Sequence, residues 1–127
     1  MTATPFHILV NGSPVLIYAS RNGSPDKVLR ILDRFLDTFW QERDLSSEHE
    51  DTPGILVAQL VVRFGFEFSE DDFSNLKVNT EFDPRAQYLY RIEGDRTIEI
   101  YVPGDRYRQD PSLGLEGCQS IETHAVP

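Results

Sequence analysis

Two short apolar runs rich in β-branched residues open the chain, at residues 6–10 and 15–19. Between them lies Asn11-Gly12, the strongest short signal for a β-hairpin, because both residue types accept a positive φ. The pattern therefore predicts a hairpin at the start of the fold.

A long amphipathic helix is predicted next, from Pro25 to about Leu45. Ser24 is a suitable N-cap, and proline is favoured at the first helical position because its missing N–H would have no partner there. Apolar residues then recur at three- and four-residue spacing: Val28, Ile31, Leu32, Phe35 and Phe39.

A second apolar line, made of Leu29, Leu36 and Trp40, runs beside this stripe. With it the apolar face is about 180° wide, whereas a surface helix needs only about 100°. Two interpretations stay open. The line packs on a second helix while the main stripe packs on the sheet, or it forms part of a peptide groove or dimer surface, where tryptophan is a typical anchor.

The next apolar run, residues 55–64, follows an Asp-Thr-Pro start signal and ends at Gly65, a plausible residue to stop a helix. Its β-branched content also allows a buried strand, but the signals at both ends favour a helix. Only Gln59 and Arg63 are polar, four residues apart. We therefore expect a helix that is nearly all buried, with one narrow hydrated edge.

Three further strands are expected at residues 76–78, 87–92 and 97–102, the last two as a hairpin. A three-residue loop at 94–96 places most apolar residues of that hairpin on one face, whereas a slip of one residue would turn every side chain over. This register pairs Ile92 with Ile98, Tyr90 with Ile100 and Tyr88 with Val102, and it puts Leu89, Arg91, Glu99 and Tyr101 on the opposite face.

Tyr88, Tyr90 and Tyr101 form a second candidate binding patch on this hairpin. The alternative is half-buried packing between strands, which aromatic residues also favour.

The order β-β-α-α-β-β-β predicts an α+β fold: a single antiparallel sheet of about five strands with two helices packed on one face. Residues 1–117 are expected to form one domain. Residues 118–127 carry few large apolar side chains and are expected to be a flexible C-terminal tail.

The formal net charge is −9, from 21 acidic and 12 basic side chains. This charge disfavours nucleic acid and anionic membranes, which attract Lys and Arg, and favours basic partners. No basic and apolar leader opens the chain, and the longest apolar run is about half of a membrane span. A cytoplasmic protein is the simplest expectation.

Catalytic signatures are missing from the sequence: it has no phosphate-binding loop, dinucleotide fingerprint, nucleophile elbow or zinc-protease motif. The three histidines do not obviously converge. The acidic runs 48–51 and 70–72 are interpreted as solvated charge, and Cys118 as an inert thiol. We therefore expect no enzyme, no catalytic residue, no cofactor and no metal.

Several strings resemble a family of small cyanobacterial proteins, the CcmS-like β-carboxysome assembly factors, over most of residues 6–118. They are Ile8–Gly12, Ile17–Pro25, Asp71–Leu76, Asp95–Thr97 and Pro111–Gly117. None of them is a catalytic signature. The resemblance implies a carboxysome-associated adaptor in carbon dioxide fixation, which would bind the C-terminal extension of a hexameric shell protein. It carries no binding motif onto individual residues.

The leading hypothesis is a non-enzymatic adaptor or assembly chaperone that captures a peptide of a partner protein, at a strand edge or in a groove beside the long helix. One alternative is a small-molecule binder or small enzyme with a pocket that holds Arg63, Arg91 or Glu67. Another is a constitutive subunit of a larger complex, and a homodimer also stays open.

Overall fold

The computed structural model describes residues 4–47, 50–68 and 76–126, without the side chains of residues 65–68. The elements along the chain are β1 (Phe6–Val10), β2 (Leu16–Ala19), α1 (Pro25–Ser46), α2 (Thr52–Phe68), β3 (Leu76–Asn79), β4 (Tyr88–Ile92), β5 (Thr97–Pro103), α3 (Asp105–Gln109), the 3-10 helix η1 (Pro111–Gly117) and β6 (Cys118–Ala125).

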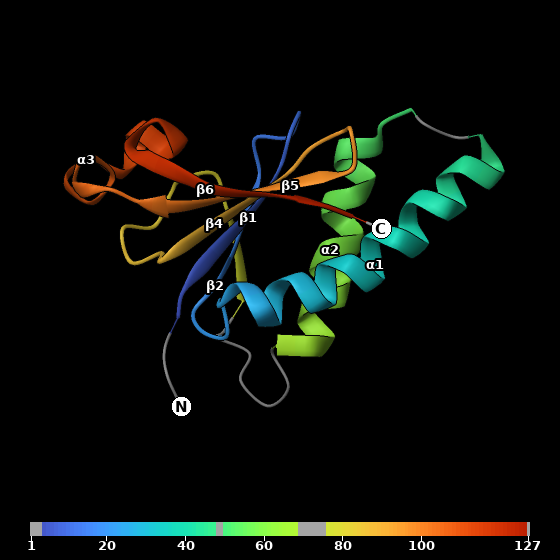
Figure 1. Ribbon diagram of the computed structural model, residues 1–127, viewed down its shortest axis with the longest axis horizontal. Coiled ribbons are helices and arrows are strands. Elements are labelled where there is room, and N and C mark those ends of the chain that lie inside the picture. The colour runs from blue at the N-terminus through green and yellow to red at the C-terminus, as the bar shows by residue number, and fades with distance from the viewer. Residues whose placement is uncertain (1–3, 48–49, 69–75, 127) are drawn as a thin grey trace.

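One six-stranded sheet in the order β3-β2-β1-β4-β5-β6 carries the fold (Figure 1). The α+β class is confirmed, but the sheet is mixed rather than antiparallel and has six strands rather than about five. The central strands β1 and β4 run parallel, with Phe6 opposite Tyr88 and Val10 opposite Ile92. Alternation of side chains shows which residues face the core, but not the direction of a strand that returns after a long connection.

In the two hairpins, the residues of the connecting turns determine the register and the positions with a positive φ. In β4–β5, Tyr90 lies opposite Ile100 and Ile92 opposite Ile98, so the predicted register is confirmed, with Arg96 at φ +68° in the loop. In β1–β2 only Gly12 takes a positive φ, +97°, because the connection is longer than a two-residue turn.

Residues 118–125 form the edge strand β6 rather than the predicted flexible tail. The strand pairs with β5 from Ala125 opposite Thr97 to Cys118 opposite Pro103. An edge strand is held largely by backbone hydrogen bonds, which a hydrophobic pattern does not reveal. The folded unit therefore continues past residue 117.

Helices α1 and α2 pack on one face of the sheet and enclose the main core, while α3 and η1 lie at the opposite end of the molecule (Figure 1). The C-terminal end of α1 projects beyond the sheet. On the second face Tyr107 of α3 is completely buried against Leu9, Leu16 and Leu89. The helices that the sequence predicts thus cover one face, and two short unpredicted ones cover part of the other.

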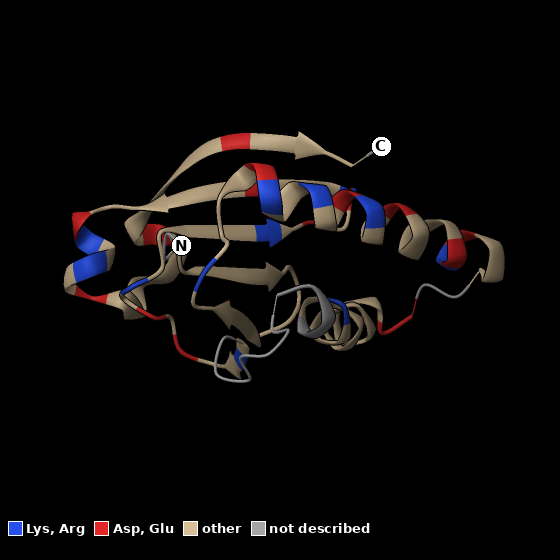
Figure 2. Cartoon of the chain, turned by 90° about the horizontal axis from the view of Figure 1, so that it is seen from below, with Lys and Arg blue, Asp and Glu red and all other residues tan. Residues whose placement is uncertain are grey.

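Helix α2 is longer and less buried than the sequence predicts. It continues through Gly65 to Phe68, because glycine inside a helix costs only about 1 kcal/mol. Leu56, Leu60 and Phe64 are buried, but Ile55 is 39% and Val62 is 56% exposed. Figure 2 shows α2 almost free of charge along its described length, whereas acidic and basic residues alternate along α1. Within the described ranges, no helix has the length and apolar character needed to cross a bilayer.

Candidate functional site

The six residues predicted to bind a partner do not share one surface. Leu36 and Tyr90 are completely buried in the main core, where the Tyr90 hydroxyl donates to the carbonyl oxygen of Gly23 at 2.6 Å. Leu29 and Tyr88 are partly buried against the same core. Tyr101 packs on the opposite face of the sheet. Trp40, the sixth, is 7% exposed and lines a cavity.

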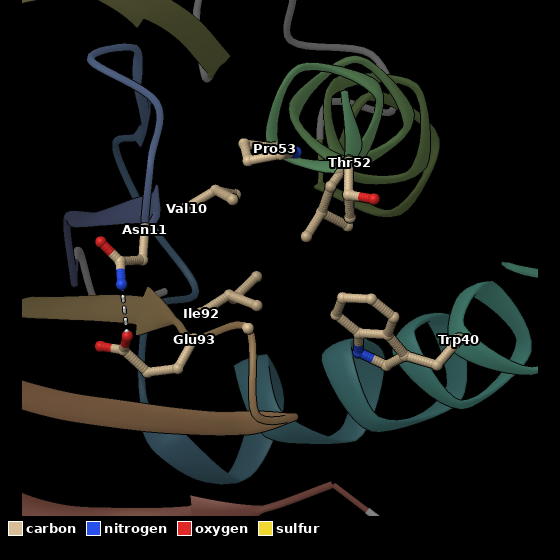
Figure 3. Close-up of a pocket in the computed structure, with 9 residues that line it drawn as sticks. Val10, Asn11, Trp40, Thr52, Pro53, Ile92 and Glu93 are labelled. Atoms are coloured by element: carbon tan, nitrogen blue, oxygen red, sulfur yellow. Dashed lines mark hydrogen bonds between the residues drawn. The ribbon is translucent and has the colours of Figure 1, made fainter. Parts of the chain in front are cut away.

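The Trp40 cavity has a volume of about 260 Å³ and lies where the first turn of α2 meets the ends of β1 and β4 (Figure 3). The turn between β1 and β2 closes one side, and the β4–β5 loop closes another. The lining is mostly apolar with a few polar groups: Val10, Asn11, Trp40, Thr52, Pro53, Leu56, Ile92, Glu93 and Gly94.

Some polar groups of the Trp40 cavity have hydrogen-bond partners, whereas another has none among the described residues. Asn11 Nδ2 donates to Glu93 Oε2 at 2.9 Å, as Figure 3 shows, and Glu93 also accepts from Arg91. The Arg96 guanidinium lies 5.3 Å from the Trp40 ring centre. Trp40 Nε1 is buried and has no hydrogen-bond partner among the described residues. A buried donor without an acceptor costs about 1–3 kcal/mol, so this atom marks a place for an acceptor.

A second and larger hollow, which we call the helix groove, separates α1 from α2 and has a volume of about 380 Å³. A smaller hollow of about 150 Å³ shares Phe35, Thr38 and Arg63 with it and extends it toward Ile31 and Arg34. The remaining lining residues come from both helices: Phe39, Glu42, Arg43 and Ser46 from α1, and Ile55 and Gln59 from α2.

Two arginines lie over the aromatic floor of the helix groove. The Arg43 guanidinium is 5.8 Å from the ring centre of Phe39, and that of Arg63 is 5.9 Å from the ring centre of Phe35. Arg43 Nη2 donates to the carbonyl oxygen of Glu50 at 2.9 Å, while its Nε is buried without a partner in the described part of the chain. The floor is therefore apolar and its edges are cationic.

One exposed apolar side chain lines this groove, and two others lie on the same two helices. Ile55 lines it, and Val62 lies on the outer side of the same helix. Leu45, 88% exposed, lies one residue from the lining residue Ser46 at the end of α1. Large apolar groups left in water at one end of a molecule are typical of an interaction surface.

The residues named for a small-enzyme pocket lie in different places where the structure describes them. Arg63 lines the helix groove, whereas Arg91 pairs with Glu93. The side chain of Glu67 lies outside the described residues, as do parts of the two acidic runs, at residues 48–49 and 70–72.

Several titratable side chains outside these two hollows are buried or contact other elements of the fold. Burial lowers the pKa of His7 to about 4, so its imidazole is neutral near pH 7. Burial raises the pKa of the Cys118 thiol to about 11, which disfavours the reactive thiolate. His124 Nε2 lies 2.8 Å from Asp33 Oδ1, between β6 and α1. In the described ranges no three His, Cys, Asp or Glu residues form a group that could hold a metal ion.

The sequence predicts a groove beside the long helix at Leu29, Leu36 and Trp40, and it misses the helix groove because the floor of that groove belongs to the stripe predicted to be core. Phe35 and Phe39 are buried, yet their outer edges line the groove. The sequence did carry one signal of this groove, in α2. The polar edge of that helix is narrower than a helix on the surface of a single compact domain would have.

Comparison with known proteins finds no matching family model, no matching curated protein and no matching solved structure.

Proposed function

We propose that this protein is a non-enzymatic adaptor or assembly chaperone that holds a peptide segment of a partner protein in the helix groove. The observation that carries the proposal is the uncovered apolar surface between α1 and α2. Phe35 and Phe39 line its floor, and Ile55, which also lines it, is 39% exposed. Covering these side chains would remove apolar area from water, at roughly 25 cal/mol per Å².

The helix groove is favoured over the sheet edges as the binding surface. Strand β3 has only four residues and carries Lys77, and short charged edges resist pairing with another strand. Strand β6 is longer, but its pairing with β5 shifts register between Ile100 and Tyr101. Such a bulge twists an edge away from an incoming strand.

The proposal is tested by replacing an exposed residue that lines the groove. We expect Ile55→Asp to abolish the capture of a specific partner from source-cell extract, because a charge would have to be buried on binding. Ile121→Asp is the matched control, since Ile121 is 49% exposed on β6. The proposal fails if no protein is bound specifically, or if both variants capture the partner equally well.

The family resemblance supplies one candidate partner, the C-terminal extension of a hexameric carboxysome shell protein. That extension can be titrated directly into the wild-type protein and Ile55→Asp by calorimetry. This identity stays a prediction, and the adaptor proposal does not depend on it.

A second candidate function is small-molecule binding in the Trp40 cavity. It is favoured by the unpartnered Nε1 of Trp40, which offers one hydrogen bond inside a mostly apolar space of about 260 Å³. Native mass spectrometry of protein purified from its source should then show a bound compound that Trp40→Phe loses. A mass equal to that of the bare chain would exclude this candidate.

A further inference from the structure

We propose that the Trp40 cavity takes a small aromatic molecule whose polar group donates a hydrogen bond, as a hydroxyl or an ammonium does, and is not a carboxylate. This inference rests on the second candidate function, small-molecule binding in that cavity. It is independent of capture in the helix groove, because the two hollows share no described lining residue.

The rim of the Trp40 cavity is held by bonds between the elements that form it. The backbone N–H of Asn11 donates to the carbonyl oxygen of Ile92 at 2.9 Å, which joins the ends of β1 and β4. The Arg96 guanidinium donates to both carboxylate oxygens of Asp44, at 2.7 Å and 2.8 Å, and so ties the β4–β5 loop to α1. A pocket whose walls are already ordered loses little entropy when it binds a ligand.

The volume of the cavity limits the size of the ligand. An engineered apolar cavity of about 150 Å³ binds benzene, so a cavity of about 260 Å³ has room for one ring with a short side chain. Pockets for drug-sized ligands usually have about 300 Å³ or more. The space therefore fits a molecule of about ten non-hydrogen atoms.

The apolar part of the cavity suits an aromatic ring. Val10, Leu56 and Ile92, from three different elements, line it together with the indole ring of Trp40. Trp40 Nε1 has no hydrogen-bond partner among the described residues, so the indole can adjust to a ligand without breaking a hydrogen bond. Aromatic rings in edge-to-face or offset contact attract each other beyond the effect of buried area.

Asn11 and Glu93 lie together on the side of the cavity away from Trp40 (Figure 3). Glu93 Oε2 accepts from Asn11 Nδ2 at 2.9 Å, and Glu93 Oε1 accepts from Arg91 Nε. An ionised carboxylate offers about four acceptor positions and no donor, so about two positions of Glu93 remain for a ligand. A hydroxyl or an ammonium group of the ligand can donate to them.

A ligand carboxylate would meet the charge of Glu93 instead. Glu93 is the one charged residue among the described residues that line the cavity, and its side chain is 15% exposed. Arg91, which pairs with Glu93, does not line the cavity. Like charges repel more strongly where water is partly excluded than in open solvent, so the cavity should discriminate against carboxylates.

The test uses probes that share a phenyl ring and differ in the head group: 2-phenylethanol, phenethylamine and phenylacetate. Trp40 is the only tryptophan of the chain, so its indole N–H gives a single signal in a proton–nitrogen NMR spectrum of the full-length protein. We expect the alcohol and the amine to shift this signal and the backbone signals of Ile92 and Gly94, with dissociation constants of about 1 mM or less. Phenylacetate should bind about tenfold or more weakly.

Glu93→Gln tests the discrimination, because it removes the charge and keeps the shape of the side chain. We expect the preference for the alcohol over phenylacetate to fall about tenfold. Glu122→Gln is the matched control, since Glu122 is exposed on β6 and does not line the cavity, and it should change the preference less than about twofold. A ratio of two affinities on one variant is not changed by a general loss of stability.

The possible outcomes separate the ligand class from the candidate function. Phenylacetate that binds as tightly as the alcohol, or a preference that Glu93→Gln leaves unchanged, overturns the donor class while leaving small-molecule binding in the cavity intact. The aromatic class is overturned if no probe shifts the Trp40 signal at about 10 mM, or if the shifts are confined to residues outside the cavity. If protein purified from its source also carries no bound compound, the second candidate function fails as well.

Discussion

His7 is a buried histidine held between two backbone groups on the second face of the sheet. Its Nε2 accepts from the backbone N–H of Asp83 at 2.8 Å, so Nδ1 carries the proton and donates to the carbonyl oxygen of Ile17 at 3.3 Å. These two bonds join β1 to β2 and to the segment before β4. Only the neutral imidazole can make both of them.

Stability should therefore decrease on acidification below the ordinary pKa of histidine. Burial lowers the pKa of folded His7 to about 4, whereas unfolded histidine titrates near 6.5. As pH falls from 6.5 to 4, the unfolded chain takes up a proton that the folded chain refuses. The free energy of unfolding should lose about 3 kcal/mol over this range and no more from His7 below it.

Urea unfolding of the wild-type protein and of His7→Gln, from about pH 7 to pH 4.5, measures this contribution. The variant should be less stable at pH 7 and show a shallower pH dependence. Parallel pH profiles for the two proteins would show that His7 is not held neutral.

At the level of residues, alternation predicts the β4–β5 pairing of Tyr90 with Ile100, because only one register keeps the apolar face together. It does not predict that Leu36 and Tyr90 are completely buried. A sequence shows that a side chain is apolar, but not how much protein will cover it. Trp40 differs from these two residues, because part of its surroundings is a cavity rather than packed protein.

Helix α2 has a buried side and an apolar outer side, and they should respond differently to truncation. Leu60 is completely buried, while Val62 is 56% exposed. We expect Leu60→Ala to lower the free energy of unfolding by about 2–5 kcal/mol, and Val62→Ala to change it by less than about 0.5 kcal/mol. Urea unfolding of both variants checks this. A large loss for Val62→Ala would mean that its side chain is covered in solution.

Strand β6 should be an integral part of the sheet. Ending the chain after Gly117 would leave the outer edge of β5 unpaired and uncover Ile98 and Ile100, which β6 flanks. We expect the thermal midpoint to fall by about 5 °C or more, the shift that about 1 kcal/mol produces in a domain of this size. Scanning calorimetry of the shortened chain checks this. An unchanged midpoint would restore the flexible-tail prediction.

At the level of elements, the sequence predicts α1 well, because a cap, a proline and a long 3.6-residue period all agree. The parallel pairing of β1 with β4 has no local signal. It depends on where the chain returns after α1, α2 and β3. The short helices α3 and η1 were missed for a related reason, since segments this short have too few turns to show a period.

The two ends of the molecule differ in how much apolar surface they leave uncovered. At one end the two short helices α3 and η1 close part of the second face around Tyr107. At the other end α1 projects beyond the sheet (Figure 1). The helix groove beside it combines an apolar floor with arginines.

Hydrogen–deuterium exchange of the protein, alone and with its captured partner segment, tests the binding surface most directly. We predict slower exchange in residues 31–46 of α1 and 55–63 of α2, with little change in β6. Slower exchange confined to β6, with α1 and α2 unaffected, would show that the partner adds a strand to the sheet and would contradict a role for the helix groove.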